Sequence, residues 1–92
     1  MKELKDLTDA EKSVLIVSYF KLDKSLSCHQ PKQKIFKGIT NIKPNLRNRA
    51  FKSLVSNGFL REHPTKGNTT YNLTLKGLKA ANQHIRDNFN NL

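Results

Sequence analysis

The apolar positions follow helical spacing over most of the chain and alternate in one later stretch. The first helix is predicted over residues 9–21, because Thr8 and Glu11 have the spacing of a capping box. Residues 14–20 of this segment are apolar except for Ser18. A helix that is apolar nearly all round is buried on more than one side. It is therefore either the central core helix of a monomer or a helix with one side facing a second subunit.

A second long helix is predicted over residues 44–57, and its two faces differ sharply. Pro44 suits its first position, and Gly58 suits the residue that follows its end. Its apolar face comprises Leu46, Ala50, Phe51 and Leu54. Its opposite face comprises Asn45, Asn48, Arg49, Lys52 and Ser56. The opposite face has amides and cations but no acid, and such groups can bond base edges and phosphates.

Shorter elements are predicted before and after this helix. Pro31 opens a short helix over residues 32–37, and Gly38 ends it. Later in the chain the period changes. The β-prone runs at 59–63 and 69–73 flank a glycine-containing loop, and this pattern predicts a β-hairpin.

The final helix is predicted over residues 75–88, where apolar residues recur at helical spacing. This stripe comprises Leu78, Ala81, Ile85 and Phe89. Residues 1–7 precede the first capping box and are expected to form a flexible start. A length of 92 residues suits one small domain. The sequence therefore predicts a single α+β domain over 1–92, with three helices, a hairpin and a C-terminal helix.

The charge distribution adds a partner to this picture. The formal net charge is +10, and residues 24–61 hold nine cations and no acid. These cations are Lys24, Lys32, Lys34, Lys37, Lys43, Arg47, Arg49, Lys52 and Arg61. Their mutual repulsion opposes folding, so a structural role alone explains them poorly, and a polyanionic partner explains them better. Nucleic acid is the first expectation and an anionic membrane surface the second. Lys2, Lys5 and Lys12 lie among acids and are expected only to aid solubility.

Side chains that could support catalysis or bind a metal are few. Cys28 is the single cysteine, so no internal disulfide can form. Cys28 and His29 lack the paired ligand spacing of a zinc site, because His63 and His84 lie far along the chain. Without a catalytic cluster or a glycine-rich phosphate loop, we expect no enzyme activity, metal or other cofactor. Without an apolar run fit for a signal peptide or membrane span, we expect a cytoplasmic location.

The order of the elements resembles that of the winged helix-turn-helix family. Residues 54–60, Leu-Val-Ser-Asn-Gly-Phe-Leu, are similar to the family's Leu-x-x-x-Gly-aliphatic run. Residues 73–77, Leu-Thr-Leu-Lys-Gly, are similar to its Leu-Thr-x-x-Gly after the wing. Over about residues 8–88 the chain looks like the small archaeal and bacterial transcription regulators of the MarR-like kind.

The resemblance implies that the helix over 44–57 enters the major groove of duplex DNA, usually from a dimer. It also implies that the hairpin loop contacts the flanking backbone or the minor groove. It places near the bases Asn45, Asn48, Arg49 and Lys52, with Ser56 on the same face. It places at the wing Lys66 and Asn68. Further phosphate contacts are expected from Lys32, Lys34, Lys37 and Lys43. Arg47 is expected either at a phosphate or in a structural role.

The leading interpretation is a sequence-specific regulator that binds double-stranded DNA as a homodimer, paired through its first and last helices. One alternative is a winged-helix module that docks on other proteins, which the nearly all-apolar first helix favours. Another alternative is duplex RNA binding. The lack of an aromatic stacking platform argues against unpaired RNA but not against an RNA duplex.

Overall fold

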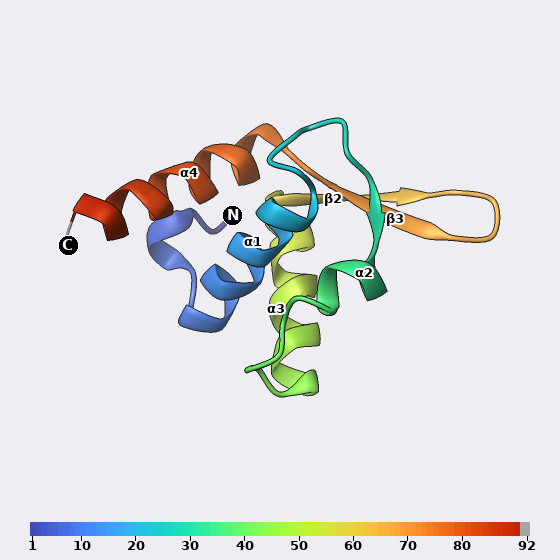
Figure 1. Cartoon of the computed structure of the whole chain (residues 1–92), viewed down its shortest axis with the longest axis horizontal. Coiled ribbons are helices and arrows are strands. Elements are labelled where there is room, and N and C mark those ends of the chain that lie inside the picture. The colour runs from blue at the N-terminus through green and yellow to red at the C-terminus, as the bar shows by residue number, and fades with distance from the viewer. Residues whose placement is uncertain (91–92) are drawn as a thin grey trace.

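The computed structural model describes residues 1–90 and has the predicted order of elements. Its helices are the 3₁₀ turn η1 (Leu4–Asp6), α1 (Asp9–Lys21), α2 (Lys32–Phe36), α3 (Pro44–Ser56) and α4 (Leu75–Asn90). Its strands are β1 (Gln30–Pro31), β2 (Leu60–Pro64) and β3 (Thr69–Leu73). The β2–β3 hairpin projects on one side of the domain and the distal half of α4 on the other (Figure 1). The α+β class is confirmed.

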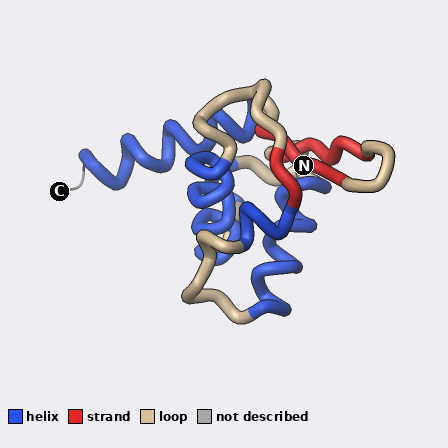
Figure 2. Tube along the Cα trace, turned by 45° about the vertical axis from the view of Figure 1, so that its right-hand side comes forward, coloured by secondary structure: helices blue, strands red, loops and turns tan. Residues whose placement is uncertain are grey.

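The sheet contains one strand that the sequence did not predict. Its order is β1-β3-β2, and both pairs are antiparallel, with Tyr71 opposite Gln30 on one side and Glu62 on the other. The short β1 lies alongside the hairpin where the chain enters α2 (Figure 2). Local sequence gave no signal for β1, because a strand this short next to Pro31 depends on pairing with β3.

The core forms where α1, α3 and the first strand residues meet. Val14 and Leu15 of α1 are fully buried, as are Leu54 of α3 and Phe59 just after it. The polar Ser18 is buried as well, and its hydroxyl donates to the carbonyl of Val14 over 2.7 Å. This bond satisfies the one polar group within the apolar run of α1, so the helix can be buried on more than one side.

The predicted ends of α3 are confirmed. Pro44 occupies its first turn, Asn57 follows its last residue, and Gly58 has a φ of +80°. Gly58 therefore adopts the left-handed conformation that ends helices without a Cβ penalty. The apolar face differs from the prediction at Leu46, which is 47% exposed. Leu46 lies in the first turn of α3, beyond the part of the helix that α1 covers.

The start of α4 is packed tightly against the residue that precedes β2. Thr74 accepts from the amide of Gly77 over 3.0 Å, so it caps the helix as predicted. A Cβ placed on Gly77 would lie 2.0 Å from the carbonyl oxygen of Phe59. Only glycine permits this approach of the helix to the backbone. Leu75, which continues the alternation of β3 in sequence, is instead 54% exposed.

Residues 1–7 are more ordered than the predicted flexible start. Leu7 is 6% exposed, and the amide of Lys2 donates to the side-chain oxygen of Asn57 over 2.9 Å. The Lys2 ammonium also pairs with the Glu11 carboxylate over 3.0 Å. The expectation that Lys2 only aids solubility is therefore wrong. It arose because local charge counts do not show which acid a lysine reaches in the fold.

Candidate nucleic-acid interface

The outer face of α3 is fully available to a partner. Asn45, Asn48, Arg49, Lys52 and Ser56 are all exposed, as the helical phase predicted. None of these side chains forms a hydrogen bond or ion pair within residues 1–90. The structure thus brings together the predicted base-reading residues on one surface. Their contact with bases remains a prediction.

The inner face of α3 is anchored by a buried carboxylate of α1. Glu11 is 3% exposed and accepts a hydrogen bond from the hydroxyl of Ser53. Burial by itself would raise the pKa of the Glu11 carboxyl, but hydrogen bonds from Ser53, Thr8 and Lys2 outweigh it and lower the pKa to about 2. The capping box pointed to Glu11 as a helix cap, but its bond to α3 required the tertiary structure.

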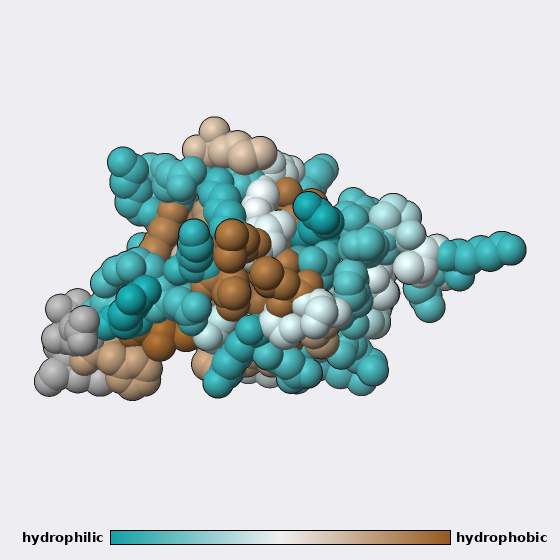
Figure 3. All heavy atoms as spheres, turned by 90° about the horizontal axis from the view of Figure 1, so that it is seen from above, coloured by the Kyte–Doolittle hydropathy of each residue, from teal (hydrophilic) through white to brown (hydrophobic). Residues whose placement is uncertain are grey.

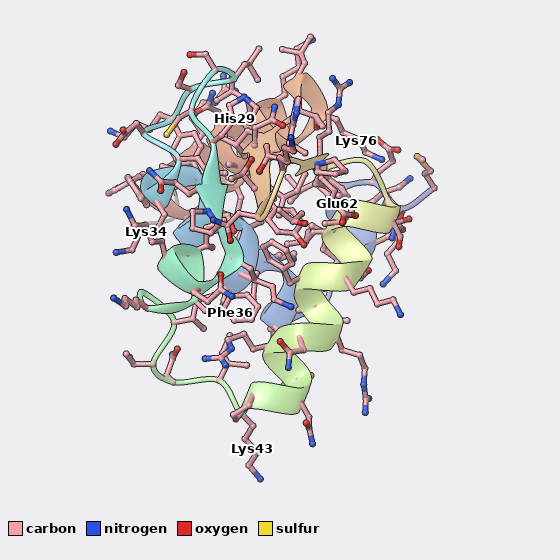
Figure 4. The ribbon with its side chains drawn as sticks, turned by 90° about the vertical axis from the view of Figure 1, so that its right-hand side faces the viewer. His29, Lys34, Phe36, Lys43, Glu62 and Lys76 are labelled. Carbon is pink, nitrogen blue, oxygen red and sulfur yellow. The ribbon has the colours of Figure 1, made fainter. Side chains whose placement is uncertain are left out.

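The end of α3 is held by Lys76 of α4. The Lys76 ammonium donates to the carbonyl oxygens of Lys2 over 2.6 Å and of Asn57 over 2.8 Å. It also lies 4.5 Å from the ring centroid of Phe59. Figure 4 shows Lys76 beside the upper end of α3. Sequence reasoning missed this lysine, since no local pattern distinguishes it from an exposed one.

A polar hollow of about 360 Å³ lies between α2 and the tip of the hairpin. Its lining comprises Lys32, Gln33, Thr65, Gly67, Asn68, Thr69 and Tyr71. Burial and the nearby Glu62 carboxylate raise the pKa of Tyr71, so its phenol remains a hydrogen-bond donor at neutral pH. The hollow joins two of the predicted phosphate contacts, Lys32 and Asn68, in one place.

The remaining predicted lysines are spread around this hollow. Lys66 is exposed at the tip of the hairpin, which backbone bonds between Thr65 and Asn68 close. Lys37 is exposed at the end of α2. Lys43 extends outward at the start of α3, whereas Lys34 points away from α3 (Figure 4). The structure therefore does not bring Lys34 onto the outer face of α3. The wing itself is hydrophilic, and apolar surface gathers over the body of the domain (Figure 3).

Arg47 differs from the other predicted phosphate contacts because it is half-buried. Its guanidinium carbon lies 4.4 Å from the ring centroid of Phe36 in α2. Its Nε is shielded from solvent and has no hydrogen-bond partner within the described residues. Arg47 therefore lies at the α2–α3 contact rather than on the outer face of α3.

Two histidines that are far apart in sequence meet beside the hairpin. The ring centroids of His29 and His63 are 4.5 Å apart, with the ring planes at 82°. The sequence could not show this pair because it depends on the unpredicted strand β1. Within residues 1–90, no group of three His, Cys, Asp or Glu side chains could hold a metal ion. The same residues include no helix that is both long enough and apolar enough to span a membrane.

An apolar hollow lies between α1 and the distal half of α4. It has a volume of about 480 Å³ and is lined by Ile16, Phe20, His84, Ile85, Asn88 and Phe89. Phe20 is 52% exposed and Phe89 is 69% exposed. Large aromatic side chains at this exposure mark a surface that a partner would cover. We refer to this lining as the α1–α4 patch.

The fold is that of a winged-helix domain, as comparison with solved structures shows. The chain is similar to Lactococcus lactis ZitR, a MarR-family winged-helix regulator, with a TM-score of 0.64 and 19% sequence identity. The match covers 88% of this chain and 52% of ZitR, so the chain spans about half of the ZitR length. No family model matches the chain. No curated protein matches it either. At this identity, the likeness shows the fold, and the MarR-like subtype stays a prediction.

Proposed function

We propose that this protein is a transcription regulator that binds double-stranded DNA sequence-specifically, with α3 in the major groove and the hairpin on the flanking backbone. The observation that supports this most is the outer face of α3. Its amides and cations have no partner within the described chain, while Ala50, Phe51 and Leu54 hold the opposite face in the core. A helix of this diameter fits the major groove, where Arg and Asn can pair with guanine and adenine edges.

The surroundings of α3 supply the contacts that would fix its register. Lys43 lies at its start, and the hollow between α2 and the hairpin tip presents Lys32 and Asn68 beside hydroxyl groups. Phosphate contacts from such groups orient a protein on the duplex without reading sequence. In this proposal the protein works inside the cell on duplex DNA and needs no cofactor.

We also propose that the regulator acts as a homodimer through the α1–α4 patch. Phe20 and Phe89 belong to the two helices that the sequence assigned to dimerisation, and both are exposed. A second copy would cover this apolar surface and set two α3 helices on one face of the DNA. The patch equally favours a second candidate function, docking on an unrelated protein.

A binding assay with four probes tests the proposal. The protein is titrated against duplex DNA selected from a random library, scrambled duplex DNA, duplex RNA and single-stranded DNA, at several salt concentrations. We expect selection to yield a preferred duplex that binds more tightly than the other three probes. Equal binding to all duplexes would contradict sequence specificity, and preference for duplex RNA would replace the proposed partner.

A further inference from the structure

A chain of aromatic rings connects α2, α3 and the hairpin. The ring centroids of Phe36 and Phe51 are 5.2 Å apart at 89°, and those of Phe51 and Tyr71 are 4.7 Å apart at 82°. Both are edge-to-face contacts, which favour a defined mutual orientation of the rings. Phe51 is 3% exposed, so the contacts are held in the core. A movement of α3 relative to α2 would therefore disturb the packing of Tyr71 in β3.

Arg47 closes this chain on the side of α2. Its guanidinium carbon lies 4.4 Å from the Phe36 ring, within the range of a cation–π contact. The ammonium of Lys32 lies 5.6 Å from the same ring centroid. Figure 4 shows Phe36 between α2 and α3. The two elements are thus joined by an arginine of α3 stacked on a phenylalanine of α2.

The burial of Arg47 distinguishes it from an arm that reaches for phosphate. Its Nε is shielded and lacks a partner, which carries a desolvation cost. A planar guanidinium stacked on a ring offsets that cost, and an ammonium in its place would stack less well. Withdrawing Arg47 to meet a phosphate would break the contact with Phe36. Its burial therefore favours a role inside the domain.

We propose that Arg47 is a positioning residue that sets the orientation of α3 for base reading, acting through Phe36. Asn48 and Arg49 follow Arg47 on the same rigid helix, so a rotation of α3 that releases Arg47 also displaces both. The ring chain extends this control to β3 and the hairpin through Tyr71. The proposal rests on the proposed DNA-binding function, and it removes Arg47 from the set of direct DNA contacts.

The contact itself is tested on the full chain without DNA. In the unaltered protein, the ring current of Phe36 should shift the Arg47 side-chain proton resonances upfield in NMR spectra. Phe36→Leu should abolish that shift, and Arg47→Met should move amide resonances in β3 as well as in α3. Arg47 resonances at ordinary positions in the unaltered protein would overturn the stack, whatever the protein binds.

The role in reading is tested by two measurements on the selected and scrambled duplexes. Arg47→Met and Phe36→Leu should each lower the ratio of specific to non-specific affinity about 10-fold, because a displaced helix loses a bidentate base contact. The slope of log affinity against log salt should stay unchanged. The double variant should be no worse than either single one, and Arg47→Lys should recover part of the ratio. Circular dichroism checks that each variant is folded at the assay temperature.

Lys43→Met is the matched control, because Lys43 is an exposed cation at the start of the same helix. It should lower the salt slope by about 0.9 and leave the specificity ratio unchanged. The same result for Arg47→Met would overturn the proposal and make Arg47 a phosphate contact. If the unaltered protein binds no duplex at all, both the proposed function and this role fail, while the NMR result still reports on the stack.

Discussion

The Glu11 carboxylate of α1 accepts a hydrogen bond from the Ser53 hydroxyl on the inner face of α3. The same carboxylate accepts from the backbone amide of Thr8 over 2.8 Å and pairs with the ammonium of Lys2 over 3.0 Å. One buried acid therefore joins the N-terminal segment, the start of α1 and the helix proposed to read DNA. Its protonation would weaken all three connections together.

Acid should destabilise the domain through Glu11. Its pKa is about 2 in the folded protein against 4.5 ordinarily. A lowered folded-state pKa adds stability that is complete above the ordinary value and is lost as pH falls from about 4.5 toward 2. Glu11→Gln should therefore lower the free energy of unfolding near neutral pH by about 1–3 kcal/mol and flatten its dependence on pH in that window. Urea denaturation across this range measures both effects.

The control for Glu11→Gln is Asp9→Asn, which alters an exposed carboxylate in the first turn of the same helix. Asp9→Asn should change the free energy of unfolding by only about 0.5 kcal/mol. Equal losses in the two variants would show that helix-terminal charge, rather than the bond to Ser53, explains the effect.

Arg49 and Lys66 should affect DNA binding in different ways. Arg49→Ala should cost about 1–3 kcal/mol on the preferred duplex and relax discrimination at one base position. Lys66→Ala should weaken binding to all sequences alike, since the hairpin tip is expected at the backbone. Affinities for a set of single-base variants of the preferred duplex measure both. A uniform loss for Arg49→Ala would show that the reading face of α3 is wrongly assigned.

Affinity for duplex DNA should fall steeply with salt. If about five cations per subunit neutralise phosphates, the slope of log affinity against log salt should be about −4 to −5 per subunit. Binding should also favour duplex DNA over anionic vesicles at equal ionic strength, because the apolar face of α3 is committed to the core. Parallel titrations from low to physiological salt measure both preferences. A shallow slope with DNA, or tighter binding to vesicles, would overturn the nucleic-acid interpretation.

The α1–α4 patch should hold a homodimer together. Light scattering at micromolar concentration should give the mass of two chains, and the double variant Phe20→Asp with Phe89→Asp should give the mass of one. Leu46→Asp is the control, because Leu46 is an exposed apolar residue outside the patch and should leave the mass unchanged. A strict monomer, both free and bound to DNA, would contradict the dimer and favour docking on another protein.

Gly77 should resist replacement even by alanine. Alanine is favoured over glycine within a helix by about 1 kcal/mol, so the change would stabilise an unhindered site. Here the added Cβ would meet the Phe59 carbonyl oxygen at 2.0 Å, and Gly77→Ala should instead destabilise the domain by about 1–3 kcal/mol. Thermal denaturation, with the exposed Lys79→Ala as control, measures the sign. A stabilised variant would show that α4 does not approach the Phe59 backbone this closely.

Local sequence was enough to predict the helices, the hairpin and the exposed face of α3. Pro44 and Gly58 marked the ends of α3, because they act on backbone conformation within a few residues. The phase of Asn48 and Arg49 followed from the apolar residues on the other side of the same helix. Such signals depend on neighbours in sequence, so they need no knowledge of the rest of the fold.

Only the tertiary structure showed which distant residues meet. Strand β1 depends on pairing with β3, and the contact of Arg47 with Phe36 depends on how α2 lies against α3. Glu11 could be recognised as a helix cap from its spacing to Thr8, but its bond to Ser53 spans two helices. Spacing along the chain carries no information about such pairs, because packing of the whole core sets the distances between elements.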